Sequence, residues 1–138
     1  MTKGLVVTLD LGPEQAETVV REELAQVGFG VLTEIDVSSV LRAKLGVDRE
    51  TLKILGACNP VFAHRALEAD PDVALLLPCN VVLQAEDGGT RVSVVDPRSI
   101  IEGSGELAGL ADEVTNDLKK ALDRCEARAA RLKELGTA

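Results

Sequence analysis

The chain has 138 residues, of which 46% are hydrophobic and 28% charged, and its formal net charge is −8. This length predicts a single domain over residues 1–138, and the aliphatic content excludes a disordered chain. Only Phe29 and Phe62 are aromatic. A single-strand binding groove needs aromatic rings among basic side chains, and a duplex footprint needs clustered positive charge. We therefore expect no nucleic-acid partner.

No apolar run approaches the roughly 20 residues that a membrane helix needs, so we expect no membrane partner. The first residues lack the basic region and apolar stretch that are typical of a secretory signal. The cysteines, Cys58, Cys79 and Cys125, are odd in number, and a reducing compartment disfavours disulfides. These features together predict a cytoplasmic protein with free thiols.

The first half of the chain predicts strands that alternate with helices. Apolar and polar side chains alternate at the start of the chain, as in a strand. Pro13 followed by acidic residues indicates the first turn of a helix, and Gly28 and Gly46 indicate two helix ends. We expect a strand at 4–10, a helix at 13–27, a strand at 30–36, a short helix at 37–45 and a strand at 51–58.

A helix and a long extended segment follow. Asn59 is a good cap and Pro60 a good first residue for a helix that continues to about Ala69. Apolar side chains from Val73 onward share one alternation, so we interpret residues 73–86 as one strand-like stretch. Because proline cannot donate to a strand ladder, we expect a bulge or a sheet edge at Pro78 within that stretch.

The end of the sheet is predicted from turn residues. Asp87-Gly88-Gly89 is typical of a hairpin turn and leads to a strand at 90–96. Ser99 and Glu102 have the spacing of a helix capping box. Gly103-Ser104-Gly105 is expected to be a break before the last helix.

A long helix is predicted at the C-terminal end, from about residue 106 to residue 135. It would extend about 45 Å, which is more than one small sheet covers. We therefore place the core at about 3–125 and expect 126–138 either to meet a second copy of the chain, in a homodimer, or to form a solvated tail. Cys125 is expected to be structural, because it belongs to the apolar seam of Leu107, Ala111, Val114, Leu118, Ala121, Cys125 and Leu132.

The order of elements predicts an α+β fold. Most strands are joined by short connections, which favours a mainly antiparallel sheet of four to five strands with helices packed on one face. The long C-terminal helix completes this arrangement.

Cys58 and Cys79 are the strongest candidates for chemistry. Cys58 ends a predicted strand just before a helix, where free backbone amides favour a thiolate and lower a thiol pKa. Each cysteine precedes an asparagine, Asn59 or Asn80, whose amide can donate to a sulfur. If the two strands are neighbours, we expect both thiols to face one pocket. The alternative is that both are packed and inert, as free cysteines usually are.

A metal site is only weakly indicated. The sequence has no Cys-x-x-Cys spacing and no four clear ligands, so no structural zinc is predicted. A soft metal ion could use Cys58 and Cys79 as thiolate ligands, with the single histidine, His64, as a third ligand. A lone helical histidine is more often a surface residue. No other cofactor is predicted.

Acidic side chains offer a further candidate site. Glu34 and Asp36 alternate on one strand face, with Asp10 and Asp96 at strand ends, and together they could perform general acid–base chemistry. The alternative is that these residues are solvated acids and helix caps.

At the two cysteines the sequence resembles a known family. The segments that carry the resemblance are 28–36 (Gly-Phe-Gly-Val-Leu-Thr-Glu-Ile-Asp), Leu45-Gly46, 54–60 (Ile-Leu-Gly-Ala-Cys-Asn-Pro), 76–81 (Leu-Leu-Pro-Cys-Asn-Val) and Asp96-Pro97. They are similar to the bacterial family called domain of unknown function 302, over about residues 3–125. The resemblance implies a β-α-β4-α arrangement like that of the TATA-box-binding protein, and it implies no established activity. A fold likeness carries no DNA function, because function belongs to sites.

Three functions remain open at this point. The first is a small binding or redox module in which Cys58 and Cys79 line a pocket. The second is an enzyme that uses Cys58 as nucleophile, with His64 or a carboxylate as base. The third is a non-catalytic homodimeric interaction protein whose cysteines only pack.

Overall fold

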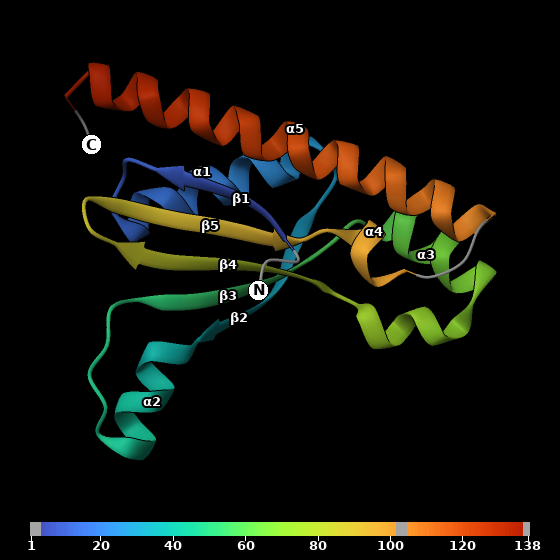
Figure 1. Cartoon of the computed structure of the whole chain (residues 1–138), viewed down its shortest axis with the longest axis horizontal. Helices are drawn as coiled ribbons and strands as arrows, with labels where there is room; N and C mark the ends of the chain where they lie inside the picture. The colour runs from blue at the N-terminus through green and yellow to red at the C-terminus, as the bar shows by residue number, and fades with distance from the viewer. Residues whose placement is uncertain (1–3, 102–104, 137–138) are drawn as a thin grey trace.

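The computed structural model describes residues 4–101 and 105–136 and shows an antiparallel sheet in the order β1-β5-β4-β3-β2 (Figure 1). Its strands are β1 (Gly4–Leu9), β2 (Gly30–Asp36), β3 (Leu52–Cys58), β4 (Cys79–Glu86) and β5 (Gly89–Val95). The α-helices are α1 (Pro13–Gln26), α2 (Val37–Leu45), α3 (Pro60–Ala69), α4 (Pro97–Ile100) and α5 (Glu106–Glu134), and a 3-10 helix, η1, covers Pro71–Leu76. The predicted α+β class and the β-α-β4-α order are confirmed, with α2, α3, η1 and α4 inserted between the main elements.

One face of the sheet is buried under α1 and α5. Side chains alternate along each strand, so every second residue points toward these helices. Leu9, Leu55, Leu83 and Val92 lie on that face and are fully buried. They pack against the apolar seams of α1 and α5, which makes this layer the main core.

The opposite face of the sheet, which we call the open face, carries no helix packed flat against it in the described part of the chain (Figure 1). The side chains on this open face are those of the strand residues that lie between the buried ones, such as Val6, Ile54 and Val82. The register shifts between Val31 and Thr33, which is a bulge in β2 that the sequence analysis did not predict.

The C-terminal part of α5 does not overhang the molecule. Ala129 is buried, Leu132 packs against the core, and Arg128 pairs with the acids of α1 in the same chain. The expectation of a solvated tail was therefore wrong for residues up to Glu134, whereas contact of this segment with a second copy stays a prediction. The reason is that α5 runs diagonally over both α1 and β1, so its support is longer than the sheet alone (Figure 1).

The interpretation of residues 73–86 as one strand-like stretch was also wrong. Asp70 caps η1 by accepting a hydrogen bond from the Asp72 backbone N–H, and β4 begins only at Cys79. Pro78 therefore precedes the strand, joined to Leu77 by a cis peptide bond, and marks neither a bulge nor an edge. Residues 73–77 are all apolar, so they show no apolar–polar period that could distinguish a strand from a helix.

The helix ends follow the predicted chemistry in part. Gly46 ends α2 in the left-handed conformation, with φ of 67°. The predicted capping box at Ser99 was not correct, because Ser99 lies inside α4 and the Asp96 carboxylate caps that helix. The other half of that box, Glu102, and the predicted break at Gly103-Ser104 lie outside the described residues.

Candidate functional site

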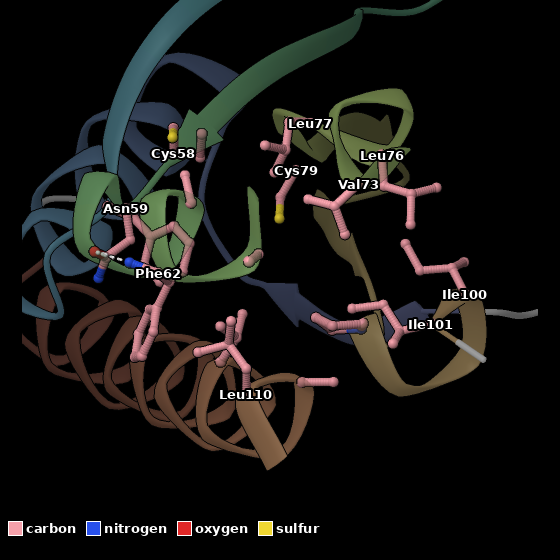
Figure 2. A pocket seen from close by; sticks show the side chains of 17 residues that line it. Cys58, Asn59, Phe62, Val73, Leu76, Leu77, Cys79, Ile100, Ile101 and Leu110 are labelled. Atoms are coloured by element: carbon pink, nitrogen blue, oxygen red, sulfur yellow. Dashed lines mark hydrogen bonds between the residues drawn. The ribbon is translucent and has the colours of Figure 1, made fainter. Parts of the chain in front are cut away.

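A cavity of about 70 Å³ lies where the ends of β3 and β4 meet α3, η1, α4 and α5 (Figure 2). Its wall is almost entirely apolar. The side chains labelled around it in Figure 2 include Phe62 of α3, Val73, Leu76 and Leu77 around η1, Ile100 and Ile101 around α4, and Leu110 of α5. Elements far apart in the sequence therefore close one apolar space.

Cys79 provides a polar group inside this cavity. Its sulfur points into the space in Figure 2. Burial raises the pKa of the Cys79 thiol, and the nearby Cys58 raises this pKa further. The thiol is consequently protonated at neutral pH, so Cys79 is a weak nucleophile and a poor soft-metal ligand as it stands.

Cys58 borders the same cavity but presents its sulfur differently. Ala57, not Cys58, lies opposite Cys79 in the ladder between β3 and β4, and Ala57 faces the helices. Alternation then turns Cys58 toward the open face, and Figure 2 shows its sulfur beside the end of β3, directed away from the cavity. The two cysteines lie on neighbouring strands and line the same cavity, as predicted, but only the Cys79 sulfur points into it.

Asn59 has a structural role at the start of α3. Its side-chain oxygen accepts hydrogen bonds from the backbone N–H groups of Val61 (3.0 Å) and Phe62 (3.3 Å). Its amide donates to the Val27 carbonyl at 3.3 Å. The amides that we expected to stabilise a Cys58 thiolate are thus used by Asn59, and the Asn59 amide donates to a carbonyl instead of a sulfur.

Two other candidates lie away from the cavity. Asn80 is exposed and lies opposite Gly56 on the open face. The His64 side chain is 76% exposed, and its imidazole lies 4.0 Å from Glu68 on the surface of α3. His64 does not line the cavity, so the structure does not bring it to the Cys79 thiol as a base or as a ligand. Among residues 4–101 and 105–136, no three His, Cys, Asp or Glu side chains gather as a metal site.

The acidic candidates also lie elsewhere. Glu34 accepts hydrogen bonds from Arg21 (2.7 Å) and Lys53 (2.9 Å), and Lys53 bridges to Glu17 of α1. Asp36 caps α2, and hydrogen bonds from the Ser38 hydroxyl and the Ser39 backbone lower its pKa. These carboxylates connect elements and do not form an acid–base pair with the thiols.

Sequence reasoning did not identify the apolar wall of the cavity. Phe29 and Phe62 both belong to this wall, with ring centroids 6.5 Å apart. The available signal was the spacing of Phe62 and Ala66 on one face of the predicted helix. That spacing alone does not show which partner the face meets.

The fold and the cavity together define a small α+β protein in which the end of an antiparallel sheet and the surrounding helices enclose an apolar space containing a thiol. The chain belongs to the family described as domain of unknown function DUF302, whose model matches residues 5–125. It is similar to a solved structure, the crystal structure of an uncharacterized conserved DUF302 protein from Bacillus stearothermophilus. The two are 30% identical, the match covers 91% of this chain and 99% of that one, and the TM-score is 0.84.

No curated protein matches the chain. None of the helices in the described part of the chain is both long enough and apolar enough to span a membrane.

Proposed function

We propose that this protein is a small-ligand-binding module whose cavity takes the aliphatic end of a ligand. The observation that carries the proposal is an apolar space with a single protonated thiol, Cys79, pointing into it. Binding sites for small molecules are concave, mostly apolar and provided with few polar groups, and this cavity has that composition. The free thiols fit a reducing compartment, so a cytoplasmic location is part of the proposal.

The size of the cavity limits the group that it takes. A volume of 70 Å³ is about half of an apolar cavity known to accept benzene. A short alkyl end therefore fits without rearrangement, whereas an aromatic ring does not.

The polar part of the ligand would lie outside the cavity. Val73, Leu76, Ile100 and Ile101 also line an outer hollow of about 210 Å³, together with the carboxylates Asp70 and Asp72. Two acidic side chains at this mouth disfavour an anionic group by like-charge repulsion. The polar end of the ligand is accordingly neutral or positively charged.

Other functions left open by the sequence are less well supported. A nucleophilic cysteine needs a base within hydrogen-bond reach, and His64 lies on the exposed side of α3. A dithiol redox pair needs two sulfurs that face each other, and Cys58 and Cys79 project from opposite faces of the sheet.

The proposal is tested by titrating the protein with 1-propanol and 1-hexanol and following side-chain methyl resonances by NMR. We expect saturable shifts at Val73 and Leu77. We expect affinity to increase by about fourfold per added methylene, or about 0.8 kcal/mol, until the cavity is filled. Hexylamine should bind more tightly than hexanoate.

A matched pair of variants on α3 provides the control. Ala66 is buried in the cavity wall, so Ala66→Leu fills the space and should abolish binding. Ala69 lies on the same helix but is exposed, so Ala69→Leu should bind as the unmodified chain does. Absence of saturable shifts, or equal binding by Ala66→Leu, would contradict the proposal.

A further inference from the structure

The open face of the sheet carries a row of side chains that is mostly apolar. The register of all four strand pairs aligns one residue of each strand across the sheet: Val6, Ser93, Val82, Ile54 and Ile35. All but Ser93 are aliphatic, and the row ends are well exposed, with Val6 at 38% and Ile35 at 50%. We call these five residues the transverse row.

The open face is almost free of charge. Among the strand residues whose side chains lie on the open face, only Arg91 and Glu86 are charged in the described part of the chain. By comparison, 28% of all residues in the chain are charged. Two copies that each carry a net charge of −8 repel each other unless their contact excludes the acidic side chains. The open face is therefore a surface through which this acidic chain can meet its own copy with few opposing carboxylates, Glu86 at the end of β4 being the one on the described strands.

The transverse row is also self-complementary. Val82 is the middle residue of the row and lies on β4, the middle strand of the sheet. Consider two sheets stacked with their open faces together and a two-fold axis that lies between them and passes over Val82. If the axis runs along the row, each residue faces its own equivalent; if it runs along the strands, the row of one copy lies on the reversed row of the other. Such self-complementarity is what a symmetric dimer requires.

The available area is sufficient for a dimer. With strands about 4.8 Å apart and a rise of about 3.3 Å per residue, five strands of about six residues present roughly 500 Å². Two copies would then bury about 1,000 Å², which is near the lower limit for a specific interface. Helix α2 projects beyond the β2 edge of the sheet and has no buried residue (Figure 1). Its Val40 and Leu45 are 47% and 70% exposed.

We infer that the open face, centred on the transverse row, is the interface between two copies of this chain. This interface lies on the side of the sheet opposite the core helices and does not depend on the ligand-binding proposal. It replaces the earlier expectation of a dimer through α5, whose apolar seam is already covered by α1 and β1 of the same chain.

The test is sedimentation velocity of the whole chain over micromolar to submillimolar concentrations. We expect a dimer for the unmodified chain. Ile35→Glu and Val82→Glu each place a carboxylate inside the apolar contact between the two copies and should weaken dimerisation at least tenfold. Leu75→Glu is the control, because Leu75 is 87% exposed on η1, outside the open face, and its substitution should leave the dimer unchanged.

Far-UV circular dichroism shows whether each variant is folded. Ile35 is half exposed, so Ile35→Glu decides the question even if Val82→Glu unfolds. A monomeric unmodified chain at the highest concentration would overturn the inference. So would a dimer that persists in folded Ile35→Glu, or one that dissociates equally in Leu75→Glu.

Discussion

At the scale of single residues, burial determines the behaviour of the thiols. Cys125 is 1% exposed on the seam of α5, and burial raises its pKa to about 12 from an ordinary value of 9.0. The position agrees with the structural role expected from the sequence. Burial also raises the pKa of Cys79 within the cavity. Neither group is a ready nucleophile at neutral pH.

The Cys125 thiol makes stability depend on alkaline pH. Because its pKa is higher in the folded chain, its contribution is complete below about pH 9 and is lost as the pH rises toward 12. The loss is at most about 4 kcal/mol at about 1.4 kcal/mol per pKa unit. We expect the free energy of unfolding, measured in urea, to fall less steeply from pH 9 to 11 in Cys125→Ala than in the unmodified chain. The pKa of Lys53 is raised by its two glutamate partners, but this lysine titrates equally in both proteins, so its effect on the difference between the two curves cancels. Parallel curves would contradict the assignment.

Gly56 is required by a close approach on the open face. An added Cβ would meet the Thr33 hydroxyl, and it would lie 2.8 Å from the Pro78 ring. We expect Gly56→Ala to lower the free energy of unfolding by about 1–3 kcal/mol, because the site is overpacked. Gly30→Ala, in β2 with nothing within 4 Å of the added Cβ, should change it by less than about 0.5 kcal/mol. Combining Gly56→Ala with Thr33→Ala should recover part of the loss, and equal effects of the two glycine variants would refute the explanation.

At the scale of elements, a buried carboxylate connects α1 to α5. Glu23 is 4% exposed and accepts hydrogen bonds from Arg124 (2.6 Å) and Arg128 (3.1 Å). We expect Glu23→Gln to lower stability by about 1–3 kcal/mol, because hydrogen bonds between charged groups are lost and the arginines are left without their partner.

The neighbouring acid provides the control for that variant. Glu22 also pairs with Arg128, at 3.0 Å, but its side chain is 58% exposed. Glu22→Gln should change the urea midpoint little, since exposed ion pairs contribute about 0–1 kcal/mol. If both variants lower stability equally, burial is not what gives the Glu23 pairs their strength.

At the scale of the whole molecule, the end of α5 belongs to the folded unit. Ending the chain at Cys125 removes buried Ala129, part of the core contact of Leu132 and the Arg128 pairs. We expect a loss of about 3–5 kcal/mol in thermal or denaturant unfolding. Ending the chain at Glu134 removes only exposed or undescribed residues and should leave stability unchanged. A chain ending at Cys125 that is as stable as the longer one would restore the tail predicted from the sequence.

Local patterns in the sequence predicted most elements correctly, since each depends on neighbours in the chain. Alternation identified β1 and β2, and Asn59-Pro60 marked the start of α3 through its own cap and first residue. The apolar run at 73–77 was ambiguous because it has no polar phase to fix a period. Helix length alone misplaced the end of α5, because the sequence does not show that α1 lies beneath it.

By itself, the sequence determined the α+β class, the acidic charge and the cysteine positions, whereas the pairing of β3 with β4 was only a condition of the predicted thiol site. Only the tertiary structure decided which thiol enters the cavity. Successive side chains of a strand point to opposite faces of the sheet. Cys79 lies opposite Ala57, and Cys58 is one residue further along β3, so the two sulfurs lie on opposite faces. The tertiary structure also decided that no described helix covers the transverse row. Which face of a sheet the helices cover depends on long-range packing, and local periodicity is the same for both faces.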